Sequence, residues 1–128
     1  MKSLKTPEVI DSIKQNYKLS VNDLTPHLSS ADPNARAFIA KTEHDSYFVK
    51  VKRSGIHKAS LITQFLTQNG IEEVILPLKN ISGNDFSAIG EFELALFPFI
   101  SGLDGFHKPL SREQWIVFGN LLKRIHNL

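Results

Sequence analysis

Apolar residues recur at helical spacing in the first half of the chain. The spacing predicts a helix over about residues 7–17, where Thr6 offers a capping hydroxyl and a proline suits the first turn. A second helix is predicted after Gly55 and ends at residues 69–70, an Asn-Gly pair. The apolar positions that fall on one face of this second helix are Ile56, Ala59, Ile62, Phe65 and Leu66.

A third helix is predicted at the C-terminal end of the chain. It begins after Ser111, which starts a Ser-x-x-Gln sequence of capping-box form. Its apolar stripe consists of Trp115, Phe118, Leu122 and Ile125. A stripe of this size on a single helix must be covered by another surface or remain exposed.

Alternating apolar and polar residues predict strands between the helices. "AFIAKT" and "SYFVKVK" form a predicted hairpin, joined by the three-residue loop Glu43-His44-Asp45. Three further strands are predicted in "LSVNDLTPHLSS", "EEVILPL" and "EFELALFPFI", and "KNISGNDFSAIG" reads as a turn-rich connection. Pro98 indicates that the last strand leaves the sheet near its end.

The order of these elements is helix, three strands, helix, two strands, helix. Strands that cluster in hairpins favour the α+β class over regular strand–helix alternation. We therefore expect an antiparallel sheet of about five strands with a packed helix, plus N-terminal and C-terminal helices. The length of 128 residues fits a single domain, and 41% hydrophobic with 22% charged residues predicts a packed core.

Composition excludes several kinds of chemistry. The absence of cysteine excludes disulfides, thiol catalysis and cysteine-based zinc sites, and the five histidines lack ligand-like spacing. A net charge of +2 is too small to indicate nucleic-acid binding, and the basic cluster in residues 50–58 has no interleaved aromatic residues. The N-terminus lacks the apolar run of a signal peptide, so a cytoplasmic, non-membrane protein is expected.

One strand carries a lysine between apolar neighbours. In "YFVKVKRSG", alternation places Phe48, Lys50 and Lys52 on one face of the strand. Lysines on strands usually face water, which is one interpretation of Lys50. The other interpretation is that Lys50 holds a phosphate.

The predicted order of helices and strands resembles that of the N-terminal lobe of the aminoglycoside phosphotransferase family. The stretches that carry the resemblance are "SADPNARAFIAKT", "SYFVKVKRSG", "QNGIEEVILPL", "LALFPFISGLDGF" and "LSREQWIVFGNLLKRIHNL". That family has a protein-kinase-like fold, and its spectinomycin phosphotransferase branch is the most similar in character. The resemblance covers about residues 24–128. It implies an N-terminal helix and lead-in (1–22), a kinase-like N-lobe (23–100), and a hinge loop with the first helix of a missing C-lobe (101–128).

In such a lobe ATP is held for transfer of a phosphoryl group to an antibiotic hydroxyl, the basis of antibiotic resistance. By resemblance, Lys50 reaches the phosphates, and Phe48 occupies the position of a ring stacked on adenine. The resemblance also assigns backbone hydrogen bonds with adenine to Phe99 and Ile100. The side chains of Phe48, Phe99 and Ile100 are equally suited to packing in the hydrophobic core. The loop over the phosphates is represented by Ser29, Ser30 and Asn34, which are also ordinary turn residues.

The chain departs from the family pattern in three ways. Kinase-like folds pair the phosphate-binding lysine with a glutamate on the next helix. Residues 53–71 of this chain contain no acidic residue. Either Glu72 or Glu73 therefore takes the place of that glutamate, or Lys50 is unpaired. The phosphate loop has no glycine. No "HxDxxxxN"-like motif follows the last helix, so the catalytic base and the Mg²⁺-binding residues are absent.

The functional prediction follows from these departures. We expect this chain to be the nucleotide-binding N-lobe of an ATP-dependent antibiotic O-phosphotransferase. The lobe would be a truncated form that binds ATP weakly and is not catalytic alone. Mg²⁺ would be bound only in the intact enzyme. The alternative is a stand-alone dimerising module or one half of a split kinase-like enzyme. Expected partners are a second copy, through the Trp115, Phe118, Leu122 and Ile125 stripe, or the missing C-lobe.

Overall fold

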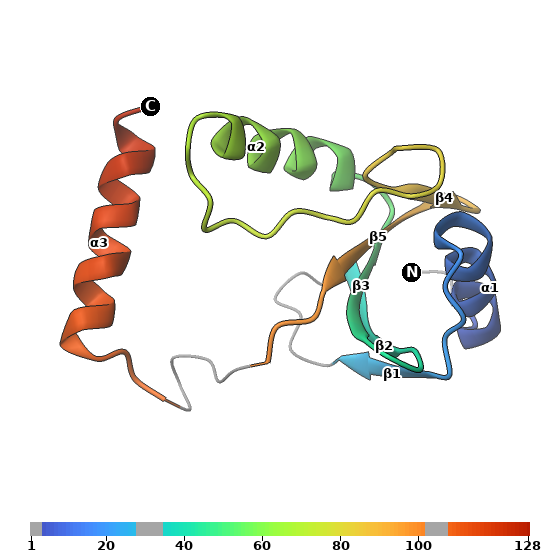
Figure 1. Ribbon diagram of the computed structural model, residues 1–128. Helices are drawn as coiled ribbons and strands as arrows, with labels where there is room; N and C mark the ends of the chain where they lie inside the picture. The colour runs from blue at the N-terminus through green and yellow to red at the C-terminus, as the bar shows by residue number, and fades with distance from the viewer. Residues whose placement is uncertain (1–3, 28–34, 102–107) are drawn as a thin grey trace.

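The computed structural model describes residues 4–27, 35–101 and 108–128 and contains a five-stranded sheet with three helices (Figure 1). The strand order is β1-β2-β3-β5-β4, and every neighbouring pair is antiparallel. The strands are β1 (Asp23–His27), β2 (Ala35–Lys41), β3 (Ser46–Lys52), β4 (Ser87–Ile89) and β5 (Phe92–Pro98). The predicted α+β class with five antiparallel strands is confirmed.

The hairpin of β2 and β3 forms as predicted, with a loop one residue longer. Lys41 pairs with Ser46, so four residues form the loop. The N–H of Thr42 donates to the carbonyl of Asp45 at 2.8 Å, and the N–H of Asp45 donates to the Thr42 hydroxyl at 3.1 Å. The threonine closes the turn through its side chain, which explains why the loop needs no glycine.

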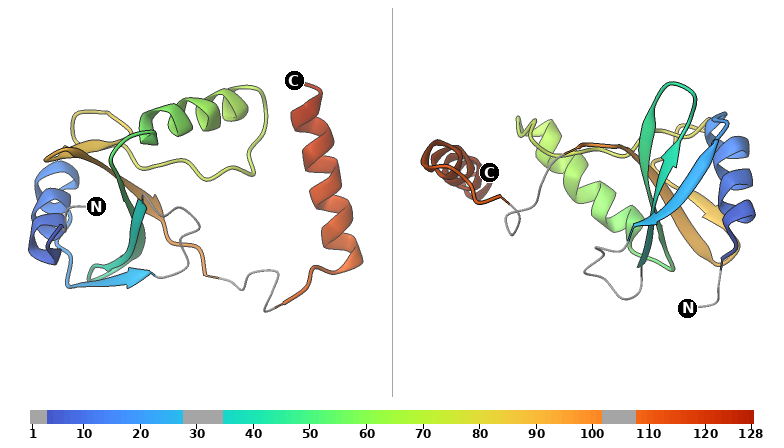
Figure 2. Two further views of the ribbon diagram at one scale, coloured as in Figure 1. Left: turned by 180° about the vertical axis from the view of Figure 1, so that it is seen from behind. Right: turned by 90° about the horizontal axis from the view of Figure 1, so that it is seen from below.

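Helix α1 (Thr6–Tyr17) covers one face of the sheet (Figure 2). Val9 and Ile13 are fully buried and Tyr17 nearly so. They pack on the sheet side chains that form the core with them, which include Phe38, Val49, Val51, Leu94 and Leu96. The predicted helix is therefore confirmed, but the predicted cap is wrong. Lys5 occupies the cap position without a side-chain hydrogen bond, because the helix begins at Thr6 itself.

Helix α2 (Ile56–Gln68) lies on the opposite face of the sheet. Gly55, with φ of 94°, allows the abrupt change from β3 to this helix, because this left-handed conformation suits glycine. The predicted apolar positions share a helix face, yet Ile62 is 63% exposed and Phe65 is 55% exposed. Within the described structure, Ile56 and Ser60 are the buried residues of α2. The first half of the helix therefore makes most of its contact with the sheet.

The fourth strand lies elsewhere than the sequence predicts. Residues 72–78, "EEVILPL", contain no strand, whereas the stretch read as a turn-rich connection supplies β4. Pro77 lacks an N–H for a sheet ladder, and Leu78 alone joins β5 here, donating to Leu96 at 2.8 Å. Ser87 instead pairs with Leu94 and continues the ladder across a tight turn. The prediction failed because a short apolar run has no periodicity that distinguishes a strand from a buried link.

Helix α3 (Arg112–His126) begins with the predicted capping box. The Ser111 hydroxyl accepts from the Gln114 N–H at 3.2 Å, and the Ser111 N–H donates to the Gln114 side chain at 2.8 Å. The helix stands apart from the sheet (Figure 1), and judged against the described parts of the chain none of its residues is buried. Arg124 connects α3 to the rest by donating to the carboxylate of Glu73 and to the Gly70 carbonyl.

No helix in the described parts of the chain has the length and apolar character needed to cross a membrane.

Candidate functional site

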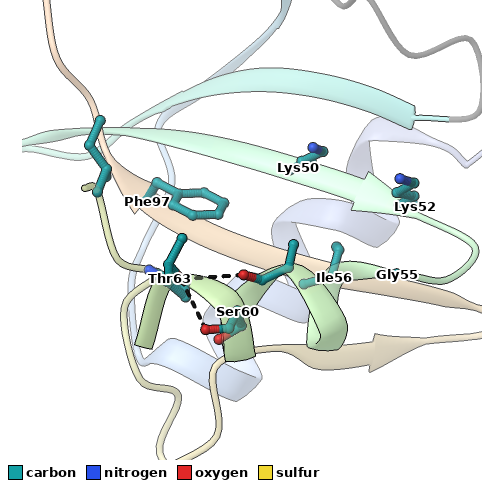
Figure 3. Close-up of a pocket in the computed structure, with 10 residues that line it drawn as sticks. Lys50, Lys52, Gly55, Ile56, Ser60, Thr63 and Phe97 are labelled. Atoms are coloured by element: carbon teal, nitrogen blue, oxygen red, sulfur yellow. Dashed lines mark hydrogen bonds between the residues drawn. The ribbon is translucent and has the colours of Figure 1, made fainter. Parts of the chain in front are cut away.

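A cavity of about 180 Å³ lies between the sheet and α2, on the face opposite α1. Lys50 and Lys52 of β3 and Phe97 of β5 form its sheet side (Figure 3). The other walls come from α2 and from the segment that follows it, through Ile56, Ala59, Ser60, Thr63, Ile75 and Pro77. The cavity is therefore largely apolar, with two ammonium groups on its sheet side.

Lys50 lies half-buried on this face, as the alternation of β3 predicts. Its neighbours across the two adjacent strands are Ala37 on β2 and Ala95 on β5. These small residues leave room for the lysine stem to lie along the sheet. The Lys50 ammonium makes no hydrogen bond or ion pair with any residue that the structure describes. An ammonium without an internal partner on a concave face can receive an anionic ligand.

Neither candidate acid pairs with Lys50. Glu72 is exposed, and Glu73 accepts hydrogen bonds from Arg124 of α3. The hydrogen bond from Arg124 is the main cause that lowers the pKa of Glu73 below its usual value. Of the two alternatives left by the sequence, the unpaired lysine is the one found among the described residues.

Phe48 lies beside the cavity, and its ring is part of an aromatic group. Its centroid is 5.6 Å from that of His27, at an interplanar angle of 82°, and 6.4 Å from that of Phe97. Phe97 was not selected from the sequence, although it is the direct cross-strand partner of Phe48. Phe97 lines the cavity and contacts Phe48, so the aromatic group lies next to the cavity and to Lys50.

The residues after β5 present backbone groups near the end of the sheet. The Phe99 N–H donates to the Ser46 carbonyl at 3.3 Å, so this predicted donor is used within the protein. The side chains of Phe99 and Ile100 are exposed, which is contrary to the core-packing interpretation. The predicted contact of the Phe99 carbonyl and the Ile100 N–H with adenine stays a prediction.

The remaining predicted ligands are in the loop between β1 and β2. Ser29, Ser30 and Asn34 lie outside the described residues. Their assignment to the phosphate loop stays a prediction.

A buried carboxylate behind the cavity was missed at the sequence level. Asp85 is 8% exposed and accepts a hydrogen bond from the Ser60 hydroxyl at 2.5 Å. The Gln64 amide and the Lys79 ammonium also donate to it. Burial raises the pKa of Asp85, but hydrogen bonds from Lys79, Ser60 and Gln64 together hold it below its usual value. Ser60 and Asp85 are far apart in the chain, so no local pattern revealed the pair.

A second carboxylate fixes the start of α2. Glu93 of β5 accepts a hydrogen bond from the Ile56 N–H at 3.1 Å. This N–H is one of the donors that a helix leaves unsatisfied at its N-terminus, and a negative charge is favourable there. The N-terminus of α2 is therefore occupied by a protein carboxylate.

A protein-bound metal ion needs several acidic or histidine side chains close together. The described segments contain no group of three or more such residues that could hold one.

The sheet order, the helix against its hollow face and the lysine on the third strand together define a kinase-like N-lobe fold. Solved structures of spectinomycin phosphotransferase APH(9)-Ia are similar to the chain. The structure in complex with ADP and spectinomycin has 29% sequence identity, a TM-score of 0.89, and coverage of 98% of this chain and 39% of that chain. The predicted resemblance is confirmed.

The AMP-bound structure of the same phosphotransferase gives a similar result. It has 26% identity, a TM-score of 0.82, and coverage of 98% of this chain and 38% of that chain. This chain therefore spans less than two fifths of the length of the solved phosphotransferase. No family model and no curated protein matches the sequence.

Proposed function

We propose that the chain is the nucleotide-binding N-lobe of an ATP-dependent antibiotic O-phosphotransferase. The observation that carries the proposal is Lys50, a half-buried residue that lines a largely apolar cavity and whose ammonium has no partner among the described residues. The similarity to a phosphotransferase whose structure contains ADP supports the same role for this face. The substrate of the complete enzyme is proposed to be a hydroxyl compound of the spectinomycin or aminoglycoside type.

The described residues suit the parts of a nucleotide in different ways. Lys50 would bind phosphate oxygens, and Phe48 with Phe97 would offer aromatic surface to the base. The Phe99 carbonyl and the Ile100 N–H would meet the edge of the base. Phosphoryl transfer also needs a base for the hydroxyl and ligands for Mg²⁺. We assign these to a further lobe, so the chain alone would bind nucleotide weakly and catalyse no transfer. We propose that the reaction takes place in the cytoplasm.

Nucleotide titration of the 128-residue chain tests the proposal. ADP binding followed by calorimetry or NMR should be saturable, and Lys50→Ala should weaken it by about tenfold or more, because a charge-assisted hydrogen bond is lost. Lys41→Ala is the matched control, since Lys41 is an exposed lysine at the end of β2 in the same sheet. Absence of binding at millimolar ADP, or equal effects of the two substitutions, would contradict the proposal.

The exposed stripe of α3 supports a second candidate function, a dimerising interaction module. Trp115 is 58% exposed, and Phe118 and Leu122 are also exposed. The rings of Trp115 and Phe118 meet edge to face at 6.1 Å, which gives a continuous aromatic surface. A surface of this kind favours association, here with a second copy of the chain.

Light scattering coupled to size-exclusion chromatography tests this candidate. The mass should rise towards that of a dimer with concentration, and the double substitution Trp115→Ala and Phe118→Ala should abolish the rise. Val117→Ala serves as control, because Val117 is exposed on the same helix outside the stripe. A strict monomer at high concentration would eliminate dimerisation and leave the N-lobe proposal untouched.

A further inference from the structure

Helix α2 has few apolar contacts to hold it in place. The chain carries no acidic residue from position 53 to 71, so the helix itself offers no carboxylate to the sheet. Leu61, Ile62 and Phe65 are exposed, and burial is confined to the first half of the helix. Apolar packing alone therefore defines the position of α2 weakly.

The Asp85 carboxylate supplies the main side-chain attachment near the middle of α2. Ser60, which is buried, and Gln64, one turn later, both donate hydrogen bonds to the same oxygen of Asp85. Lys79 donates to the other oxygen and provides the countercharge. Both carboxylate oxygens are thus engaged, and the shared acceptor joins two successive turns of the helix to the segment before β4.

The same part of α2 forms the wall of the cavity opposite β3. Ser60 lines the cavity (Figure 3) and donates to Asp85, and two further residues of α2, Ala59 and Thr63, also line the cavity. A shift of α2 away from Asp85 would therefore change the space between this wall and Lys50. The carboxylate lies outside the set of residues that line the cavity, so it acts on the cavity through the helix.

We infer that Asp85 is a positioning residue for the nucleotide site. It fixes α2 against the sheet and thereby sets the opening of the cavity beside Lys50. In this way a carboxylate from outside the helix orients the helix, whereas the helix carries none of its own to orient the lysine. The inference rests on the proposed nucleotide binding and deepens it.

Asp85→Asn tests the inference with nearly unchanged shape. A carboxamide cannot accept from Ser60, Gln64 and Lys79 at once without placing its own N–H₂ group against one of these donors. We expect the ADP dissociation constant to rise on the order of tenfold. At metal sites, removing a residue that orients a metal ligand lowers the metal affinity to a similar extent. Glu91→Gln is the matched control, because it also replaces a carboxylate with a carboxamide, in an exposed ion pair with Arg53.

Two further measurements separate positioning from a general loss of stability. Ile13→Val removes one methylene from the core beneath α1, and it should lower the melting temperature while leaving ADP affinity unchanged. Amide hydrogen exchange should accelerate in residues 59–66 of Asp85→Asn and stay unchanged in α1. Unchanged ADP affinity in Asp85→Asn, or the same affinity loss in Ile13→Val, would overturn the inference.

The two proposals fail in different ways. If the unmodified chain does not bind ADP, the proposed function fails and the positioning of a nucleotide site by Asp85 is overturned with it. If the unmodified chain binds ADP, Lys50→Ala weakens binding and Asp85→Asn does not, only the positioning role fails.

Discussion

The two helices that cover opposite faces of the sheet are attached by different interactions. Helix α1 inserts Val9 and Ile13, both fully buried, into the main core. Helix α2 turns much of its apolar surface to solvent and is held near its middle by hydrogen bonds to Asp85. The cavity lies on the α2 side. The comparison teaches that the main apolar core and the candidate site are on different faces of one sheet.

This difference has an energetic basis. Fully burying an aliphatic side chain contributes roughly 1.5–3 kcal/mol, and the contribution does not depend on direction. A hydrogen bond contributes about 0.5–1.5 kcal/mol net, but it requires defined distances and angles. Apolar burial therefore secures α1 against the sheet, whereas the polar contacts of α2 specify a position that a small change can alter.

The largest expected effect on stability comes from the face of the sheet that α1 covers. Ile13→Ala should lower the free energy of unfolding by about 2–5 kcal/mol, because it leaves a cavity under α1. Ile62→Ala on α2 should change it by less than about 0.5 kcal/mol, since that side chain is 63% exposed. Urea unfolding followed by circular dichroism measures both. Similar losses in the two variants would show that the helices are attached alike.

An intermediate effect is expected from the polar attachment of α2. Asp85→Asn should lower the free energy of unfolding by about 1–3 kcal/mol, which is the penalty for leaving buried hydrogen-bonding groups unsatisfied. We expect the lower part of this range, because the Lys79 partner is exposed and solvent screens the pair. Chemical unfolding at neutral pH measures the loss. A loss as large as that of Ile13→Ala would remove the energetic contrast between the two faces.

The pH dependence of stability sharpens the same comparison. The pKa of Asp85 is lowered in the folded chain, so its stabilising contribution is complete above the ordinary value of 3.8 and is lost as the pH falls through the lower folded value. The stability difference between the unmodified chain and Asp85→Asn should therefore shrink below about pH 4. Unfolding series at several pH values test this, and a difference independent of pH would contradict the role of the charge.

The smallest effect is expected where α3 meets the rest of the chain. Arg124→Ala removes the exposed ion pair with Glu73 and should leave the unfolding midpoint unchanged, because solvent and salt screen exposed pairs. The pKa of Glu73, lowered mainly by the Arg124 hydrogen bond, should rise towards its usual value. NMR titration of the Glu73 carboxyl group follows the change. A clear loss of stability would indicate that α3 is docked more firmly than α2.

Local signals in the sequence accounted for much of the fold. The hairpin of β2 and β3, the start of α2 at Gly55 and the capping box at Ser111 each depend on neighbouring residues, and the structure contains all three. The fourth strand was misplaced because the apolar run at residues 72–78 has the composition of a strand without a pairing partner. Pairing partners are chosen by the whole sheet, and a single segment does not encode them.

The candidate site was predictable to a similar degree. Strand alternation placed Lys50 on the correct face, because side chains on a strand alternate strictly between two faces. Phe97 and Asp85 were not selected, since each matters through a residue distant in the chain. Phe97 could have been found once β3 and β5 were taken as neighbours, because both strands carry an aromatic residue at the end near Pro98.

The sequence by itself determined the α+β class, the approximate position of each helix and the face on which Lys50 lies, because these follow from periodicities of a few residues. Only the tertiary structure decided that Lys50 lacks an acidic partner among the described residues and that α2 is held by Asp85. It also decided that Glu73 pairs with Arg124 of α3. These pairings join segments far apart in the chain, and such contacts form only when the sheet brings its neighbouring segments together.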